Sequence, residues 1–260
     1  MKFSKALITG ASSGIGAEYA HQLAEAGTSL ILVARNKDRL TSLSEELAQR
    51  YHNPVQNFEV IGADLSTTDG IEKVSRHIQA TPDLDFLINN AGYGSRGKFM
   101  DNPEKNQMDM IYVHVIAATG LTRAALPAMI ARKKGAIINV SSIAGFFPVP
   151  GNTMYCATKS YLTFFSESLQ NELIDSGIFI QALCPGLTHT EFHARMKMDQ
   201  SKLRKGPWMT TKQVVDISLR YLGSGRVVVV PGFPNRLIAF FMETFIVRQF
   251  LRWYFRNNRH

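Results

Sequence analysis

Residues 6–16 read Ala6-Leu7-Ile8-Thr9-Gly10-Ala11-Ser12-Ser13-Gly14-Ile15-Gly16. The first four predict a short buried strand, and the pattern after the glycines predicts an amphipathic helix to about residue 26, with Gly27 at its C′ position. Glycines between a strand and a helix let backbone amides and a helix N-terminus approach a pyrophosphate. The spacing is Gly-x-x-x-Gly-x-Gly, and a plain tight turn is the alternative, but the strand–turn–helix context favours a dinucleotide-binding loop.

Strands and helices alternate along the rest of the chain. Further strands are predicted at residues 29–34, 58–61, 86–88, 136–140, 178–183 and 227–230, and helices at residues 36–51, 69–79, 103–132, 153–174 and 212–222, the longest bent near Pro127. This alternation predicts an α/β fold with a doubly wound, mostly parallel sheet and helices on both faces. No internal repeat or linker is visible in the sequence, so we expect one domain over residues 1–234 and a tail over residues 235–260.

The bulk composition limits the class of protein. The chain has 260 residues, 45% hydrophobic and 19% charged, which suits a globular domain with a full core and disfavours disorder. It contains 2 cysteines, Cys156 and Cys184, which fits a reducing compartment; we interpret Cys156 as a packing residue. The first residues lead into a strand without a signal-peptide segment, and we expect a cytoplasmic protein. The longest uncharged run, residues 135–158, contains polar residues and prolines and is not expected to span a membrane.

The net charge of +8 concerns partners and solubility rather than fold. The body of the chain shows no basic patch with interleaved aromatic residues, so no nucleic acid is expected as a partner. Anionic cofactors and anionic lipid surfaces are the partners that fit this charge.

The end of the second predicted strand indicates which cofactor is bound. An acidic residue there, about 20 residues after the glycine loop, would bind a ribose 2′-hydroxyl. Here the sequence is Ala34-Arg35-Asn36-Lys37. Arg35 could clamp a 2′-phosphate, which favours NADP(H) over NAD(H); a solvated arginine at a helix start is the alternative. Asp64, after the third predicted strand, is placed to reach the adenine edge.

Tyr155 and Lys159 stand four residues apart near the start of a predicted helix that Asn152 or Thr153 could cap. A phenol with an ordinary pKa near 10 is a poor acid or base at neutral pH, and a neighbouring ammonium lowers that pKa. The pair is therefore a candidate proton donor and acceptor. A chain with 8 tyrosines can also show such a pair by chance, as an exposed aromatic residue beside an exposed lysine.

Taken together, these residues resemble the short-chain dehydrogenase/reductase family in its single-domain branch. The resemblance covers residues 5–232 and rests on five motifs: Thr9-Gly10-x-x-x-Gly14-x-Gly16, Asn89-Asn90-Ala91-Gly92, Ser142, Tyr155-x-x-x-Lys159 and Pro185-Gly186. It implies a Rossmann-type fold with a seven-stranded sheet, reversible hydride transfer between a carbonyl or alcohol and a nicotinamide cofactor, and assembly as a homodimer or homotetramer.

The resemblance also implies roles for single residues. Tyr155 would be the general acid in reduction and the general base in oxidation, and Lys159 would hold the nicotinamide ribose and lower the pKa of Tyr155. Ser142, at the family's usual distance before the tyrosine, would hydrogen-bond the substrate oxygen; a serine that merely ends a strand is the alternative. The cofactor would be contacted by Gly10, Ser12, Ser13, Gly14, Ile15, Gly16, Arg35, Asp64, Leu65, Asn90, Ala91, Gly92, Tyr155, Lys159, Pro185, Gly186, Thr188 and Thr190.

One position departs from the family pattern. In Met110-Ile111-Tyr112-Val113-His114-Val115 the family normally carries Asn where this chain has His114, and that Asn belongs to a water-linked proton path from the lysine. A histidine can hold a water, but its charge changes near neutral pH. A relay role, which would make His114 part of the catalytic set, and simple packing in the long helix both stay open.

A polar substrate lid is expected over residues 187–210. His189 and His193 flank Glu191 but do not form the His-Glu-x-x-His zinc pattern, so no metal site is predicted. Met196, Met198 and Trp208 indicate an adaptable apolar wall.

The tail, residues 235–260, has the pattern of a basic amphipathic helix. Its apolar side consists of Val247, Phe250, Leu251, Tyr254 and Phe255. Its basic side consists of Arg248, Arg252, Arg256 and Arg259. Residues 237–242 form an apolar run ahead of this amphipathic pattern, and the run is too short to span a membrane. Packing on its own domain or a sister subunit, and peripheral membrane contact, both stay open.

The predicted function is an NADP(H)-preferring carbonyl reductase or alcohol dehydrogenase for an apolar, lipid-like substrate of moderate size, with NAD(H) as the second cofactor candidate. The first alternative is an NADP(H)-binding regulatory or scaffold protein with an impaired proton relay, motivated by His114. The second is a peripheral membrane adaptor that works through the tail.

Overall fold

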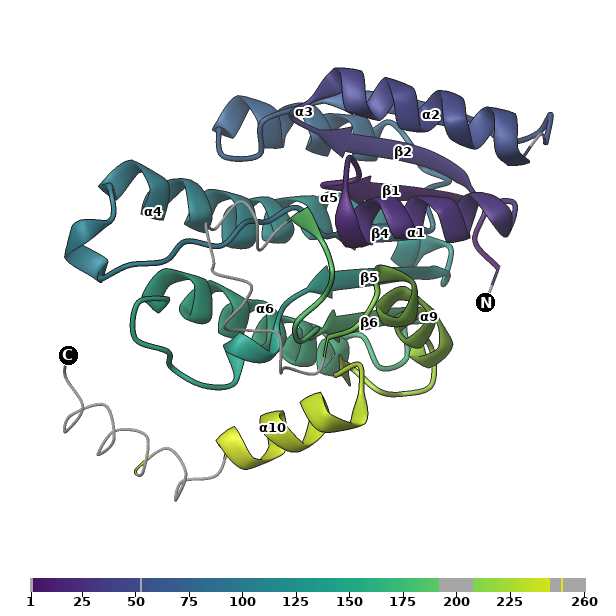
Figure 1. The fold of residues 1–260 in the computed structure, drawn as a ribbon. Coiled ribbons are helices and arrows are strands. Elements are labelled where there is room, and N and C mark those ends of the chain that lie inside the picture. The colour runs from purple at the N-terminus through teal and green to yellow at the C-terminus, as the bar shows by residue number, and fades with distance from the viewer. Residues whose placement is uncertain (1, 52, 192–207, 244–248, 250–260) are drawn as a thin grey trace.

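The computed structural model describes residues 2–51, 53–191, 208–243 and 249. Its centre is one sheet of seven parallel strands in the order β3-β2-β1-β4-β5-β6-β7 (Figure 1). The strands are β1 (Lys5–Thr9), β2 (Ser29–Ala34), β3 (Phe58–Gly62), β4 (Phe86–Asn89), β5 (Gly135–Val140), β6 (Ile178–Leu183) and β7 (Val228–Val229). The predicted Rossmann-type α/β fold is confirmed, and every strand pair in this sheet is parallel.

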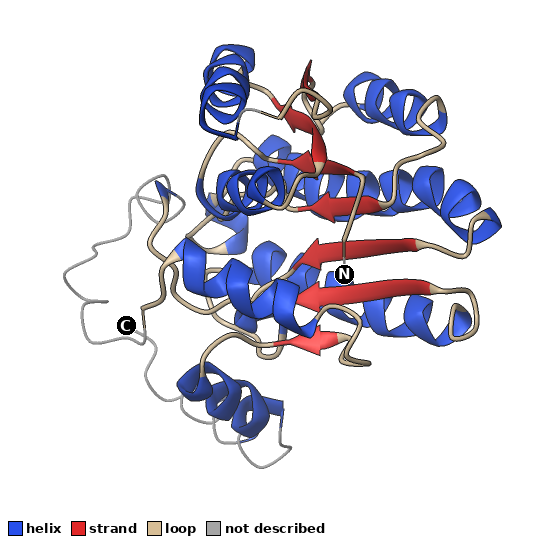
Figure 2. Cartoon of the chain, turned by 90° about the vertical axis from the view of Figure 1, so that its right-hand side faces the viewer, coloured by secondary structure: helices blue, strands red, loops and turns tan. Residues whose placement is uncertain are grey.

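Helices cover both faces of the sheet (Figure 2). They are α1 (Gly14–Glu25), α2 (Lys37–Tyr51), α3 (Thr68–Gln79), α4 (Glu104–Ile111), α5 (Ala118–Ala131), α6 (Thr153–Glu172), α9 (Thr211–Tyr221) and α10 (Phe233–Glu243). Two 3-10 turns, Phe99–Asp101 and Ile143–Gly145, and a π-helical segment, Tyr112–Ala117, complete the described elements.

The strands are apolar on both sides because both faces of a parallel sheet are covered. In β1, Ala6 and Ile8 face the core that α1, α2 and α9 close, whereas Leu7 faces the core that α3 and α5 close. All three side chains are fully buried. Strands with two buried faces read as continuous apolar runs, which is why their positions were visible in the sequence.

The predicted strands and helices match the observed ones closely. The bounds of β2 and β6 are as predicted, and most other ends differ by one or two residues, which is the usual uncertainty of a helix or strand end. The last strand is shorter than the predicted residues 227–230.

The long helix after β4 departs from the prediction. We expected one helix over residues 103–132, bent near Pro127, but the regular α-helical bonding is interrupted at the π-helical segment Tyr112–Ala117. Pro127 lies inside α5, which continues through it. The interruption therefore lies about three to four helical turns before Pro127, nearer the sheet's carboxyl edge than expected, and it contains His114.

Asn152 occupies the predicted N-cap position of α6, the helix that carries Tyr155, but it does so without a side-chain bond to the described helix. Its backbone oxygen accepts a hydrogen bond from Cys156 N at 2.9 Å. Side chains cap other described helices. Asn36 Oδ1 accepts from Arg39 N at 3.0 Å at the start of α2. Thr67 accepts from Gly70 N in α3, and Thr210 forms a capping box with Gln213 in α9.

Several expectations fall on residues outside the described ranges. In the expected lid, residues 187–191 and 208–210 are described, whereas His193, Met196 and Met198 lie outside. In the tail, α10 is described and the apolar and basic residues at 247, 248, 250–252, 254–256 and 259 lie outside. The domain boundary at residue 234 stays a prediction; α10 begins at Phe233, next to β7.

Candidate active site

The loops at the carboxyl ends of the strands enclose a cleft of about 980 Å³. This is where ligands bind in open α/β sheets. The predicted site residues that line it are Gly10, Ser12, Ser13, Gly14, Ile15, Arg35, Asp64, Leu65, Asn90, Ala91, Gly92, Ser142, Tyr155, Lys159, Pro185, Gly186, Thr188 and Thr190. The other two predicted residues, Gly16 and His114, do not line the cleft but lie behind the residues that do. The structure thus brings one continuous cleft together from segments that lie far apart in the sequence.

The glycine loop requires glycine for two different reasons. Gly10 and Gly14 have positive φ values of 65° and 60°, which other residues rarely adopt. A Cβ on Gly16 would lie 2.5 Å from Asn90 Nδ2, so here close approach excludes any side chain. Ser13, the N-cap of α1, makes no capping bond with its side chain inside the described region. The first turn of α1 therefore presents its backbone amides at the cleft, as an anionic pyrophosphate requires.

Asn90 holds the glycine loop in place. Its Nδ2 donates to Thr9 O at 2.9 Å and to Gly10 O at 3.1 Å, and its backbone N donates to Thr9 Oγ1 at 2.9 Å. These bonds tie the end of β4 to the end of β1. Asn90 is thus bonded to the glycine loop rather than standing free in the cleft.

The adenosine end of the cleft carries the cation expected for NADP(H). Arg35 is exposed and lines the cleft at the end of β2, beside Asp64 at the end of β3. Burial alone would raise the pKa of Asp64, but hydrogen bonds from Ser66 and the charge of Arg35 outweigh it and lower this pKa. Asp64 Oδ1 accepts from Ser66 N at 3.0 Å and from Ser66 Oγ at 2.8 Å. Arg35 therefore keeps an exposed guanidinium directed at this end of the cleft.

A second arginine at the same end was not anticipated. Arg39 Nη1 donates to Glu191 Oε2 at 2.9 Å and Arg39 Nη2 to Glu191 Oε1 at 3.3 Å, across the cleft from α2 to the segment after Thr190. Both side chains are about half exposed, so the pair contributes little to stability. It does neutralise Arg39, which leaves Arg35 as the better candidate for a phosphate.

Ser142, Tyr155 and Lys159 meet at the centre of the cleft. Ser142 lies two residues after β5 and caps the turn Ile143–Gly145, where its Oγ accepts from Ala144 N at 3.1 Å. Its side chain also hydrogen-bonds Tyr155. Lys159 lies one turn beyond Tyr155 on α6, and its Nζ is 5.7 Å from the centre of the Tyr155 ring. Lys159 Nζ donates to Val140 O at 2.8 Å. The spacing thus places a hydroxyl, a phenol and an ammonium on one wall.

The expected lowering of the tyrosine pKa is not found. Burial raises the pKa of Tyr155 to about 12, although the hydrogen bond from Ser142 acts in the opposite direction. Burial also lowers the pKa of Lys159 to about 8. The lysine does not act as a strong counter-charge because its ammonium is directed at Val140 O and is itself desolvated. Tyr155 is therefore held as a neutral phenol, the form that donates a proton.

His114 lies behind this wall, fully buried in the π-helical segment. Its Nε2 accepts from Tyr93 N at 3.1 Å, and its Nδ1 is 2.9 Å from Thr158 Oγ1. Burial, with a smaller contribution from the charge of Lys159, lowers the pKa of His114 well below its usual value, so the ring is neutral. Its ring centre is 6.0 Å from that of Tyr155.

The side of the cleft away from the adenosine end has features that the sequence analysis missed. Phe147, Val149 and Pro150, from the loop before α6, form an apolar wall beside Tyr155. The loop after Gly92 brings Arg96 to the same side, because Gly97 N donates to Gly151 O at 3.0 Å. Arg96 is exposed and makes no hydrogen bond or ion pair with a described residue. The only sequence signal for Arg96 was its place six residues after Asn90. This spacing does not reveal which way the side chain points.

The turn after β6 completes the cleft. Thr188 is buried and its Oγ1 donates to Gly186 O at 3.1 Å, while Thr190 lies against Gly14. His189 stacks on Trp208 at a ring distance of 4.7 Å. Within the part of the chain that the structure describes, no three potential metal ligands converge on one point.

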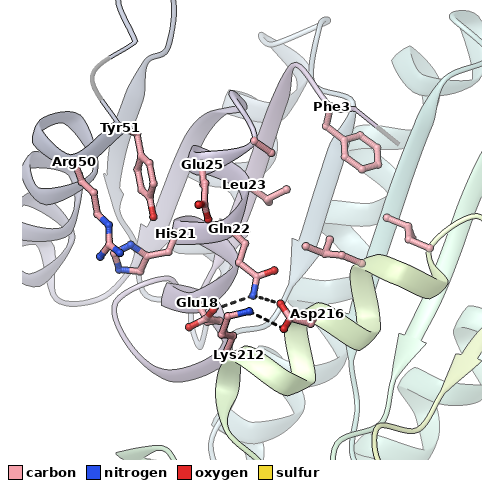
Figure 3. Close-up of a pocket in the computed structure, with 13 residues that line it drawn as sticks. Phe3, Glu18, His21, Gln22, Leu23, Glu25, Arg50, Tyr51, Lys212 and Asp216 are labelled. Carbon is pink, nitrogen blue, oxygen red and sulfur yellow. Dashed lines mark hydrogen bonds and ion pairs between the residues drawn. The ribbon is translucent and has the colours of Figure 1, made fainter.

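A second, smaller cleft of about 600 Å³ lies between α1 and α9, away from these residues (Figure 3). Its polar side chains bond to one another: Gln22 Nε2 donates to Glu18 Oε1 at 2.9 Å and to Asp216 Oδ1 at 2.7 Å, and Lys212 Nζ to Asp216 Oδ2 at 2.8 Å. These bonds join α1 to α9, and we assign this cleft a structural role.

With this geometry in place, the chain can be compared with known proteins. It matches the model of the short chain dehydrogenase family over residues 4–201. It is 39% identical over 189 residues to an NADP-dependent 3-hydroxy acid dehydrogenase from Schizosaccharomyces pombe, covering 72% of each chain. It is 34% identical over 190 residues to the human very-long-chain 3-oxoacyl-CoA reductase, covering 72% of this chain and 60% of the human protein. The matched region thus spans about 60% of the length of that relative.

Solved structures agree with the fold. A short-chain dehydrogenase from Sphingobium yanoikuyae in complex with NADPH is similar with a TM-score of 0.83 and 34% identity, over 96% of this chain and 95% of that one. A bulky-bulky ketone specific alcohol dehydrogenase from Comamonas testosteroni gives a TM-score of 0.79 and 32% identity, over 90% of this chain and 88% of that one.

Proposed function

Because this chain belongs to the short-chain dehydrogenase family, we propose that it is an NADP(H)-preferring oxidoreductase that interconverts a carbonyl and an alcohol. The observation that carries the proposal is the meeting of Ser142, Tyr155 and Lys159 in the cleft that also contains the glycine loop. A proton donor and a dinucleotide site in one cleft are what hydride transfer to a carbonyl requires.

The residues present fit a nicotinamide cofactor. The close approach at Gly16 and the positive φ values of Gly10 and Gly14 form a backbone cradle that side chains would fill. The bound cofactor supplies or accepts the hydride. In reduction, Ser142 donates a hydrogen bond to the carbonyl oxygen and Tyr155 gives its phenolic proton to that oxygen as the alcohol forms. In oxidation the same proton returns to Tyr155.

NADP(H) is the proposed cofactor because Arg35 occupies the end of β2. A guanidinium binds a phosphate through two parallel hydrogen bonds, whereas NAD(H) has only a hydroxyl at that place. The name of the yeast relative and the NADPH complex of the Sphingobium enzyme support this choice.

We propose a 3-oxo acid or its thioester, reduced to the 3-hydroxy compound, as the substrate class. The names of the yeast and human relatives support a 3-oxo or 3-hydroxy acyl substrate. Phe147 and Val149 offer an apolar wall for the chain of such a compound, and Arg96 offers a cation for the carboxylate of the free acid. The expected apolar, lipid-like substrate is thereby given a charged end.

Matched substrates test this class. We expect NADPH oxidation with a medium-chain 3-oxo acid to exceed that with its methyl ester, and Arg96→Gln to abolish the preference by lowering kcat/KM for the acid about tenfold. Arg220→Gln, an exposed arginine on α9, is the control and should change neither rate. Equal rates for acid and ester in the wild-type protein would remove Arg96 from substrate binding while leaving the reductase itself intact.

We also propose that the protein forms a homo-oligomer. Ile116, Tyr161 and Phe164 expose apolar surface on the face formed by the π-helical segment and α6, and Phe164 is 69% exposed. A sedimentation experiment that gives a single monomeric mass at micromolar concentration would contradict this assembly.

A further inference from the structure

α10 carries an apolar stripe on its outer face. Phe233, Leu237, Phe240 and Phe241 are 65%, 42%, 66% and 54% exposed. They stand at i, i+4, i+7 and i+8, so they share one side of the helix. Four large exposed side chains on three turns form a patch of the kind that marks an interaction surface.

The inner face of α10 shows that this orientation is fixed. Asn235 is buried, and its Nδ2 donates to Pro231 O at 2.8 Å. Ala239 is buried in a cluster with Phe146 and Cys184, beneath the turn that follows Ser142. A rotation that hid the phenylalanines would expose these groups. The stripe therefore faces outward because of how α10 is anchored, and Figure 1 shows the helix at the edge of the molecule, away from the sheet.

The charge of the chain beyond α10 indicates what covers the stripe. Residues 244–260 contain four arginines and no Asp or Glu, and five of these 17 residues are aromatic. Half of the net charge of +8 thus follows directly after the stripe. Aromatic and aliphatic side chains beside a cluster of arginines match an interface between anionic lipid headgroups and acyl chains. Two copies of the chain paired through this face would bring two such arginine segments together, which is unfavourable.

We propose that the outer face of α10 docks on an anionic lipid bilayer. This contact does not use a spanning helix. The described helix that is long and apolar enough to span, residues 104–131, packs through Leu121, Ala125 and Met129 on the sheet.

The inference goes beyond hydride transfer and does not depend on it. The inner face of α10 contacts the turn Ile143–Gly145, and Asn235 lies against Gly186, so the bound helix lies directly behind the substrate side of the cleft. A chain docked in this way holds its cleft close to the bilayer surface, where a compound with an acyl chain accumulates.

Co-sedimentation of the full chain with vesicles tests the docking. Wild-type protein should sediment with vesicles of phosphatidylcholine and phosphatidylglycerol, and much less with phosphatidylcholine alone or at high salt. The double variant Phe240→Ser/Phe241→Ser should lower the partition coefficient at least about tenfold. Ile174→Ser, which removes an apolar side chain 69% exposed on another surface, should not. Unchanged NADPH binding and thermal unfolding would show that both variants fold.

Two results overturn the proposal. Sedimentation that is equal for the wild type and the double variant would mean that α10 is not the contact. Absence of vesicle binding in the wild type, with a mass that falls in the double variant, would mean that the stripe pairs copies of the chain.

Discussion

His114 Nε2 accepts a hydrogen bond from the backbone nitrogen of Tyr93 at 3.1 Å. The proton of the neutral ring must therefore sit on Nδ1, facing Thr158 Oγ1 at 2.9 Å, and Thr158 in turn donates to Met154 O at 2.9 Å. Both ring nitrogens are occupied, and the ring joins the loop after β4 to α6. We propose that His114 positions these two walls of the cleft and does not pass protons itself.

Substitution of His114 separates the two roles. His114→Asn keeps one acceptor and one donor and should retain activity within about threefold, whereas His114→Leu leaves the Tyr93 amide without its partner and should lower kcat/KM about 10- to 100-fold. Since the pKa of His114 is far below its usual value, neither variant should shift the pH profile between pH 6 and 9. A wild-type limb near pH 6.5 that disappears in His114→Asn would restore the relay role.

The lowered pKa of Lys159 predicts how reduction depends on pH. Lys159 is charged below about pH 8 and loses its proton above it. Tyr155, with a pKa of about 12, stays protonated throughout. The family resemblance assigns Lys159 to the nicotinamide ribose, and loss of its charge would weaken that hydrogen bond. Carbonyl reduction should therefore be constant from pH 6 to about pH 7.5 and fall above about pH 8. A kcat/KM profile for NADPH oxidation that stays flat to pH 10 would show that the charge of Lys159 does not affect the rate of reduction.

Arg35 should determine the choice of cofactor. Arg35→Asp removes the cation and adds a charge that repels a 2′-phosphate, so NADPH should bind about 100-fold more weakly while NADH changes little. Lys37→Asp makes the same charge change two residues further on, at a side chain that does not line the cleft, and serves as the control. Fluorescence titration gives both dissociation constants. Equal losses of affinity for NADPH and NADH would show that Arg35 does not contact the 2′-phosphate.

Asp85 should contribute to stability far from the cleft. Its carboxylate accepts from Ser4 N at 3.0 Å, Ser4 Oγ at 2.7 Å and Lys134 Nζ at 2.8 Å, and the residue is 1% exposed. Burial alone would raise the pKa of Asp85, but these partners outweigh it and lower this pKa. We expect Asp85→Asn to cost about 2–4 kcal/mol in the free energy of unfolding at pH 7.

The sign of the pH effect follows from the lowered pKa. The contribution of Asp85 is complete above the ordinary aspartate pKa and is lost as the pH falls through the folded-state value. The difference between the wild type and Asp85→Asn in urea unfolding should therefore shrink in acid. Asp83→Asn, which breaks only the exposed pair with Lys5, should cost less than about 1 kcal/mol. A difference that grows as the pH falls would contradict the account.

Much of the fold and of the cleft could be predicted because the signals are local. β1 and β6 consist largely of apolar residues. The spacing of Tyr155 and Lys159 on one helix places them on one face without further information. Ser142 was assigned by its distance from Tyr155, which the family resemblance supplied. These features depend on neighbours in sequence, which is what periodicity and motif spacing report.

The rest depends on contacts between distant segments. The pKa of Tyr155 is set by burial, and Lys159 contributes little because Val140 O holds its ammonium. Arg96 reaches the cleft only through the pairing of Gly97 with Gly151. The π-helical segment likewise follows from packing, and no local pattern around His114 predicts it. The apolar run at residues 237–242 was visible in the sequence, but its outward orientation depends on how α10 packs.

The most direct test of the central claim is NADPH oxidation by the full chain with a 3-oxoacyl substrate, with Tyr155→Phe measured alongside. Loss of the phenolic proton should lower turnover by about 10²–10⁴-fold while NADPH binding stays within about twofold, since the ring is kept. Turnover that survives in Tyr155→Phe would contradict the acid/base role. A wild-type protein that binds NADPH yet reduces no carbonyl would support the cofactor-binding regulatory protein instead.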